Sequence, residues 1–466
     1  MLYFLIAMTS GLLLLFYLIN GKELISATLF VLVEYLATFI FSLFARSQYG
    51  INDISGYMVF VVLMSFVFMG FGELLSKALS SEHKPLTYNK DFTASTKNRI
   101  CLKEYVINTK TIFLFFVLSL IVAYWALRDL LSFASRNGIS GDFITTFSLV
   151  RSLTAKGIIT YTKNSFLSQA TTICAAASYV CIYIFFYNWI LCNKKKIVYL
   201  MPVIGEMLIL VSTTGRVAFI RLFTIIFSIG IVFTKTKTNW SKEKDRKIVK
   251  YVIVTFVLFL VLFRILGYLT SKSDRSDVLE NFYGYIAAGV FGFDKALNSP
   301  EIVEQSVWGH HAFYNLYVIL NSFGFRISLG SQFNESIDIG SEGLGTVMGT
   351  GLLVPTQDFG VIGMLFTRFM IGFIYQWVFM RIKGNPNCIN RPIQMIFLGI
   401  IMYPIIMSSL DDAFRSIFSI GYIYLAFYLY LFIRLFVEKQ DSLPLDSDDY
   451  SAAIATKSIG RQETVS

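Results

Sequence analysis

The feature that most constrains this chain is a series of apolar runs, each 17 residues or longer, that recur along most of its length. A helix of about 20 residues crosses the roughly 30 Å hydrocarbon core of a membrane. Because lipid offers the backbone no hydrogen-bond partner, each run is expected to be a helix. A transmembrane β-barrel would show short alternating segments instead. The sequence therefore predicts an all-α, polytopic integral membrane protein.

The apolar runs predict about 11 transmembrane helices. Their expected ranges are 2–19, 24–44, 57–75, 111–127, 166–192, 197–213, 217–233, 251–269, 360–380, 393–410 and 416–437. Pro202 and Gly205 predict that the run 197–213 is broken or tilted. We expect residues 1–438 to form one transmembrane domain. The polar residues 439–466 are expected to form a disordered cytoplasmic tail.

The distribution of basic residues predicts the orientation of the chain. Only 15% of its residues are charged and its mean hydropathy is +0.62, while its net charge is +10. Lysine and arginine gather in four connections, 76–110, 194–196, 234–250 and 381–391. Such charge collects in cytoplasmic loops, so it does not indicate a nucleic-acid partner. The N-terminus is then expected outside and the C-terminus inside.

Two long loops are left outside, residues 128–165 and 270–359. The second contains two apolar stretches, 282–293 and 312–323. Each is too short to span a membrane, so both are expected to be short interfacial or re-entrant helices. The glycine-rich segment 340–351 lacks the Gly-Lys-Ser/Thr ending of a phosphate-binding loop. Nucleotide binding is therefore not expected.

Arginines near the outer ends of the predicted spans are the strongest functional signal. In "STTGRVAFIR", Arg216 lies at the mouth of the seventh span. Arg221 lies about 7 Å deeper, at roughly 1.5 Å of rise per residue. Arg264 and Arg368 lie in the outer halves of the eighth and ninth spans. Charges inside a membrane are costly and usually face a cavity or a partner.

Three interpretations of these arginines are open. They could extend to lipid headgroups, or form structural ion pairs with acids such as Glu206 or Asp358. The functional interpretation is an anion site that opens to the outer face and includes Arg275 and Arg326 of the large loop. The planar guanidinium suits a phosphate or diphosphate, which it binds through two parallel hydrogen bonds.

Asp358 and His310 are candidates for proton transfer. Asp358 precedes the ninth span, where it is either a helix cap or a carboxylate near an acceptor hydroxyl. His310 is either a general base or packs beside Trp308. His310 and His311 are adjacent and would point apart on a helix, and no carboxylate cluster stands near them. We expect no metal and no cofactor.

Three features of the chain resemble the Wzy-type O-antigen polymerases, also called oligosaccharide repeat unit polymerases. "STTGRVAFIR" is similar to the family's Gly-Arg or Ser-Arg step between two adjacent spans. "TQDFGVIGMLFTRFMIGF" is similar to its Asp-Phe-Gly followed by a helix rich in small residues. The large external loop late in the chain is the third feature. The paired Arg-x10-Gly motifs described for some members are missing.

The resemblance implies a glycosyltransferase of lipopolysaccharide biosynthesis in the bacterial inner membrane. It would transfer the growing glycan from undecaprenyl diphosphate to a new lipid-linked repeat unit at the periplasmic face, without nucleotide sugar. A chain-length regulator protein is an expected partner. The motif match places Arg216 and Asp358 in the catalytic site, and His310 is the second candidate base. Position alone assigns diphosphate or glycan binding to Arg221, Arg264, Arg275, Arg326 and Arg368.

Two other functions remain open. An O-antigen ligase shares the architecture and passes the glycan to the lipid A core. A lipid-linked oligosaccharide flippase or other transporter needs a cavity that reaches both faces of the membrane. The arginines cluster in the outer half of the predicted spans, and this asymmetry favours an enzyme over a transporter.

Overall fold

A computed structural model describes most of the chain. The described residues are 1–81, 104–155, 158–159, 161, 163–212, 217–238, 240, 278–298, 308–329, 337–339, 345–346, 349–384 and 386–440. Arg216, Arg264 and Arg275 lie outside them, as does the expected span 251–269.

The described part of the chain is predominantly helical, as the apolar runs predict. Seven of its helices are long and apolar enough to cross a membrane: α1 (Leu2–Ile19), α2 (Ala27–Tyr49), α3 (Gly56–Ser81), α5 (Thr109–Arg136), α7 (Ser165–Phe186), α9 (Val217–Lys237) and α13 (Leu353–Gly384). Three apolar helices are shorter: α8 (Met201–Val211), α14 (Pro392–Ile406) and α15 (Ile420–Phe436). These ten helices fall on ten of the expected ranges, and the count of 11 stays a prediction.

Local sequence sets where several helices begin. Ser26 and Asn164 accept hydrogen bonds from the backbone N–H groups of Leu29 and Phe166, at the starts of α2 and α7. Pro202 occupies the first turn of α8, after a 3₁₀ turn at Ile197–Leu200. A proline fits there because that position needs no donated hydrogen bond. The expectation that the run 197–213 is broken is thus met by this change of helix type.

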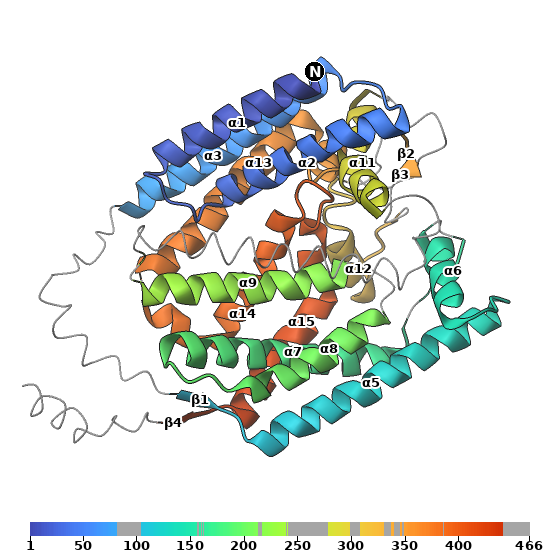
Figure 1. Ribbon diagram of the computed structural model, residues 1–466, viewed down its shortest axis with the longest axis vertical. Helices are drawn as coiled ribbons and strands as arrows, with labels where there is room; N and C mark the ends of the chain where they lie inside the picture. The colour runs from blue at the N-terminus through green and yellow to red at the C-terminus, as the bar shows by residue number, and fades with distance from the viewer. Residues whose placement is uncertain are drawn as a thin grey trace, which may run out of the picture.

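The long helices lie side by side, and their connections gather at two ends of the bundle (Figure 1). One end joins the turn after α1 to the end of α13 through the Glu23–Lys383 ion pair. It also joins Glu104 to Lys194 at 2.6 Å. We call this the basic end, because it carries the described basic residues Lys194, Lys195, Lys196, Lys237, Arg381, Lys383 and Arg391. These residues come from three of the four connections predicted to be cytoplasmic.

The opposite end of the bundle is also closed by contacts between distant segments. The N-terminal ammonium lies 2.7 Å from the Asp53 carboxylate. The Ser55 hydroxyl donates to Asp294, and the Asn315 amide donates to the backbone oxygen of Arg415. All connections predicted to face outside, so far as the structure describes them, meet at this end.

Two hydrophobic cores lie along the bundle. The first joins α1, α2, α3 and α13 with α11 (Val278–Asn298), around Tyr35 and Phe66. The second joins α5, α7, α8, α9, α14 and α15, around Tyr183 and Phe233. Ile401 of α14 contacts both cores. Helix α14 therefore lies between the two groups of helices.

Helices α3 and α13 approach each other closely through glycines. A Cβ atom on Gly72 would lie 2.0 Å from the backbone oxygen of Phe369, and one on Gly372 would lie 2.0 Å from that of Met69. Small residues allow such close backbone contact between helices in membranes. This crossing fixes α13, and with it Arg368, against the N-terminal helices.

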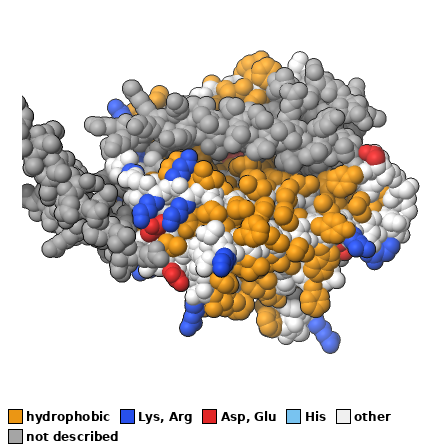
Figure 2. Space-filling model, turned by 60° about the horizontal axis from the view of Figure 1, so that its bottom comes forward, with side chains coloured by type: hydrophobic (Ala, Val, Ile, Leu, Met, Phe, Trp, Pro, Cys, Tyr) orange, Lys and Arg blue, Asp and Glu red, His pale blue; other side chains and the backbone are white. Residues whose placement is uncertain are grey.

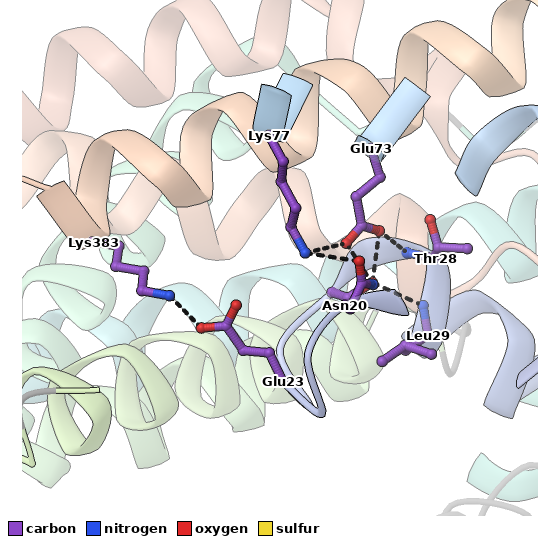
Figure 3. A network of polar contacts seen from close by, with 8 residues as sticks. Asn20, Glu23, Thr28, Leu29, Glu73, Lys77 and Lys383 are labelled. Carbon is purple, nitrogen blue, oxygen red and sulfur yellow. Dashed lines mark hydrogen bonds and ion pairs between the residues drawn. The ribbon is translucent and has the colours of Figure 1, made fainter. Parts of the chain in front are cut away.

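A polar network holds the turn between α1 and α2 onto α3 at the basic end (Figure 3). The buried carboxylate of Glu73 accepts hydrogen bonds from Asn20 at 2.9 Å and from Ser26 at 2.6 Å. It also pairs with Lys77 at 3.2 Å. A buried charge is tolerated where several partners compensate its lost hydration, so Glu73 has a structural role.

A short sheet closes the basic end. Strand β1 (Glu104–Val106) pairs antiparallel with β4 (Glu438–Gln440). Glu104 pairs with Lys194 and Lys196. Burial raises the pKa of its carboxyl, but the two lysines lower it by more than burial raises it, so the net pKa is below its usual value. The first two residues of the predicted tail thus belong to a strand, and 441–466 lie outside the described residues.

The predicted outer loops contain further helices at the opposite end. Helix α6 (Phe143–Ala155) lies in the first loop, and α11 and α12 (Tyr314–Ser322) lie in the second, with a small ladder of β2 (Ile337–Asp338) and β3 (Gly345–Thr346). Helix α11 is longer than the expected stretch 282–293. The second loop is also shorter than predicted, because α13 begins at Leu353 and bends at Gly360, where φ is 68°.

Much of one face of the molecule is apolar (Figure 2). Helix α5 contributes Phe113, Leu114, Ile121 and Tyr124, which are all exposed. Soluble proteins rarely expose large continuous apolar patches. This surface is typical of a protein whose helices are covered by lipid.

The glycine crossing predicts a selective loss of stability. Gly72→Val places side-chain atoms against the backbone of α13, and overpacking of this kind costs about 1–3 kcal/mol. The thermal unfolding temperature of the detergent-solubilised protein should fall by several degrees. Gly11→Val is the matched control, because a Cβ atom on Gly11 would meet nothing within 4 Å. Equal unfolding temperatures for the two variants would contradict the close crossing.

Candidate functional site

A cavity of about 370 Å³ opens among helix ends on the side away from the basic end. The start of α7, the end of α8, and the starts of α9 and α15 surround it, and α12 contributes Asn315. Figure 1 shows α12 beside these helices. The lining residues that carry charges, amides or hydroxyl groups are Lys163, Thr171, Thr172, Tyr179, Glu206, Arg221, Asn315, Ser416, Ser419 and Tyr422. We call this space the polar cavity.

Arg221, which the sequence analysis singled out, lines the polar cavity. It lies on the second turn of α9, and its guanidinium carbon is 5.0 Å from the ring centre of Tyr403 and 5.6 Å from that of Tyr422. Its Nε has no hydrogen-bond partner among the described residues. Aromatic faces stabilise a cation without consuming its hydrogen-bond donors. The Tyr403 side chain also forms a hydrogen bond with Arg221, so the guanidinium is held in place at the cavity wall.

Glu206 places a carboxylate in the same cavity. It lies on α8, is 3% exposed, and its Oε2 has no hydrogen-bond partner among the described residues. The charge that interacts with it is the ammonium of Lys163, on the connection before α7. A buried carboxylate with an unpartnered oxygen is costly. Because Glu206 also lines the polar cavity, its carboxylate is placed to interact with a ligand.

The connection before α7 brings Lys163 to the cavity. The hydroxyl of Tyr161 donates to Asp129 of α5 at 2.8 Å and ties this segment down. Burial lowers the pKa of Lys163, while the charges of Glu206 and Asp129 act in the other direction. Burial and the neighbouring Asp129 raise the pKa of Tyr161, so this tyrosine stays a hydrogen-bond donor.

Arg368 is fully enclosed and lies in a separate polar cluster. It is 1% exposed, and its Nη1 donates to the Ser408 hydroxyl at 2.8 Å. Glu34 of α2 lies near enough for the two charges to interact, and it accepts hydrogen bonds from the backbone and side chain of Ser409. Tyr35 donates to the Ser408 backbone oxygen at 2.7 Å. The cluster locks the end of α14 between α2 and α13.

Arg368 therefore differs from Arg221 in what surrounds it. Its neighbours are protein groups on every side, and a Cβ atom on Gly351 would lie 2.9 Å from its Nη2. These contacts favour a structural role for Arg368. The last turn of α14 and the residues directly after it connect the two arginines, because Tyr403 packs on Arg221 and Ser408 binds Arg368.

Asp358 holds the loop before α12. Its carboxylate accepts from the backbone N–H groups of His311 at 3.2 Å and Ala312 at 2.7 Å, and lies 3.1 Å from His311 Nδ1. Its side chain is fully buried. The expectation that Asp358 caps the ninth span is therefore wrong, because it lies inside α13 and its carboxylate binds the turn before α12 instead. His310 is also buried, and its ring contacts His311 and Tyr314.

The structure thus brings few of the predicted residues together. Arg221 lines the cavity, Arg368 and Asp358 are enclosed elsewhere, and Arg326 is exposed in the segment after α12. The ion pairs considered for Arg221 and Arg368 with Glu206 or Asp358 do not form in the described part of the chain.

Sequence reasoning missed several cavity residues. Glu206 was considered only as an ion-pair partner, although an acid inside an apolar run is itself a candidate functional group. Lys163, Tyr179 and Tyr422 carry no such signal. Lysines in loops and tyrosines near membrane surfaces are common.

The polar cavity combines two cations, one acid, hydroxyl groups and aromatic rings. Arg221 and Lys163 can bind phosphate oxygens, and the hydroxyl groups and Asn315 can bind sugar hydroxyls. Glu206 can accept a proton or a hydrogen bond. No group of three or more histidine, cysteine, aspartate or glutamate side chains that could hold a metal lies in the described part of the chain.

The segment between α14 and α15 carries two buried acids beside the cavity wall. Burial raises the pKa of Asp412, the charge of Asp411 adds to this rise, and Arg415 and Arg368 oppose it, so that the net pKa is about 6. Burial likewise raises the pKa of Asp411, which lies 3.4 Å from Arg415. When the pKa of a carboxyl is higher in the folded protein than in the unfolded chain, the protein loses stability as the pH rises from the unfolded pKa through the folded pKa.

We therefore predict that Asp412→Asn stabilises the protein at pH 7.5 by roughly 1–3 kcal/mol, and less at pH 4.5. At the lower pH the native carboxyl is already protonated. The asparagine keeps the acceptor for the backbone N–H of Phe414. Thermal unfolding at both pH values measures the difference.

Asp53 provides the control for this prediction. Partial burial raises the pKa of its carboxyl, but the N-terminal ammonium, the Leu2 backbone and Arg46 bring the net value below normal. Asp53→Asn should therefore give no gain at pH 7.5. A gain for Asp412→Asn that is the same at both pH values would contradict the raised pKa.

Comparisons of the chain with models of known protein families, with curated proteins and with solved structures found no match. The function must therefore be argued from the polar cavity and from the motifs that resemble the Wzy-type polymerases.

Proposed function

We propose that this protein is a surface-polysaccharide polymerase of the Wzy type in the bacterial inner membrane. It transfers the growing glycan from undecaprenyl diphosphate to a new lipid-linked repeat unit, in the synthesis of O-antigen. The polar cavity is its active site and faces the periplasm. The enzyme spans the membrane about 11 times and uses neither a cofactor nor a nucleotide sugar. A chain-length regulator is its proposed protein partner.

The observation that carries this proposal is the position of Arg221, Lys163 and Glu206 in one cavity at the end away from the basic connections. Basic connections mark the cytoplasmic side, so the cavity opens where lipid-linked repeat units arrive after export. Apolar helices surround it, and they suit a substrate whose diphosphate lies at the membrane surface and whose polyprenyl chain lies in lipid.

The proposed chemistry needs cations at the leaving group. When the bond between the sugar and the diphosphate breaks, negative charge grows on the diphosphate oxygens. Fixed cations in a site with little water stabilise that charge strongly. Arg221 is restrained by two tyrosine rings, and Lys163 lines the same cavity. The motif resemblance adds Arg216, five residues before Arg221.

The other proposed site residues have supporting roles. Asp358 fixes the backbone of the loop that leads into α12, and α12 carries Asn315 into the cavity wall. Its bound and buried carboxylate suits a positioning residue. Arg264, Arg275 and Arg326 keep their proposed role in glycan or diphosphate binding because the sequence predicts them near the outer side; Arg264 and Arg275 lie outside the described residues.

Two alternatives are separated by experiment. An O-antigen ligase would use a similar cavity and a different acceptor. A flippase would need a path between both ends of the bundle, whereas the polar cavity lies at one end. Its position among helix ends favours an enzyme over a flippase.

Deletion of the gene in its own host tests the function directly. The expected lipopolysaccharide gel shows core that carries one repeat unit and no ladder, because export and ligation continue without polymerisation. Bare core would contradict polymerase activity. Polymer accumulating on the lipid carrier would then indicate a ligase, and its absence a flippase.

The role of Arg221 predicts a loss of polymer without loss of protein. Arg221→Ala and Arg221→Lys should each reduce polymer at least 100-fold, because lysine cannot offer the planar fork to a diphosphate. Arg434→Ala is the matched control: Arg434 also packs on a tyrosine, at the basic end. Full polymer with Arg221→Lys would rule out the fork, provided that membrane levels of all variants are equal.

A further inference from the structure

Asp358, which the sequence proposed for proton transfer beside His310, and Glu206 are acids whose surroundings differ. The Asp358 carboxylate is occupied by two backbone N–H groups and by His311 Nδ1. Glu206 lines the polar cavity, and its Oε2 has no hydrogen-bond partner among the described residues. A general base needs a free oxygen within reach of the proton that it removes.

We propose that Glu206 is the general base of the glycosyl transfer, an inference that rests on the proposed function. The Glu206 carboxylate takes the proton from the acceptor hydroxyl. The acceptor oxygen forms the new bond to the anomeric carbon, and the bond from that carbon to the diphosphate oxygen breaks. The electron pair leaves with the diphosphate, whose growing charge faces Arg221. No oxidant, reductant or further reactant is needed.

The elements packed around α8 supply the conditions for this role. The titratable and charged groups that face Glu206 are Lys163 before α7, Cys174 and Tyr179 on α7, and Arg221 on α9 beyond Tyr179. On α5, the close neighbour is Ser119, which lies 2.5 Å from where a Cβ atom on Gly205 would be. Burial disfavours an ionised Glu206, and the Lys163 ammonium acts against this effect and favours the ionised form that a base requires.

The position of Glu206 is also set by that packing. Gly205 admits α5 close to α8, so the backbone at Glu206 has little freedom to shift. The carboxylate is thus pre-positioned on one wall, and Arg221 approaches from the next helix. A base and a leaving-group cation on neighbouring helices leave the space between them for the two reacting sugars.

The test uses full-length protein in lipid nanodiscs, with lipid-linked repeat unit extracted from the host deletion strain. Glu206→Gln should lower the polymerisation rate at least 100-fold, because general bases contribute roughly 10²–10⁴-fold. Its Kd for undecaprenyl diphosphate should be unchanged or lower, since loss of a negative charge beside two cations does not weaken anion binding. Glu206→Asp keeps the charge and should retain about a tenth of the rate.

The pH profile separates a base from a structural group. The rate of the native enzyme should rise with pH as Glu206 ionises, and the residual rate of Glu206→Gln should lack that rise. Glu34→Gln is the matched control: Glu34 is also a buried acid with an unpartnered oxygen, but it lies outside the polar cavity. It should keep the native rate per folded protein.

Two results would overturn the inference. One is a Glu206→Gln rate above a tenth of the native rate, and the other is an equal loss of rate and of undecaprenyl diphosphate binding. The proposed function fails in a different way, because native protein would then form no polymer from the lipid-linked repeat unit.

Discussion

Polar side chains inside apolar helices need partners within the protein, and this requirement organises the molecule. Lipid provides no compensation for a buried charge, so each one must lie against another protein group or a cavity. Glu73 meets this requirement through Asn20 and Ser26. Arg368 meets it in part, because its Nη1 donates to Ser408 while its Nε and Nη2 have no hydrogen-bond partner among the described residues. The contacts that satisfy these charges also fix which helices become neighbours.

Arg221 and Glu206 also satisfy the requirement only in part, and unlike Arg368 and Glu34 they line a cavity. Tyrosine rings stabilise the Arg221 cation, but its Nε has no hydrogen-bond partner among the described residues. The charge of Lys163 offsets that of Glu206, whose Oε2 likewise has no hydrogen-bond partner among them. Incomplete compensation of this kind costs stability. Proteins commonly accept such a cost at functional sites, where a ligand completes the missing interactions.

The cavity depends on helices that are far apart in the chain. Helix α14 lies between the two hydrophobic cores, so Tyr403 reaches Arg221 while Ser408 binds Arg368. The close glycine crossing of α3 and α13 fixes one side of this arrangement. In the proposed reaction, the cations bind the diphosphate and Glu206 takes the acceptor proton. The packed helices hold the cations and the Glu206 carboxylate at fixed positions relative to each other.

The sequence by itself determined the helical membrane class, the place of ten helices, and the separation of basic connections from arginine-rich helix ends. These follow from local hydrophobicity and from the need to satisfy backbone hydrogen bonds within each span. It also singled out Arg221, because a charge in an apolar run is costly wherever the run packs. Only the tertiary structure decided that Arg368 is enclosed, that Asp358 binds the loop before α12, and that Lys163 faces Glu206. Those outcomes depend on which helices pack together. Because the apolar surfaces of the helices are similar, their neighbours are determined by specific contacts between residues that are distant in the sequence.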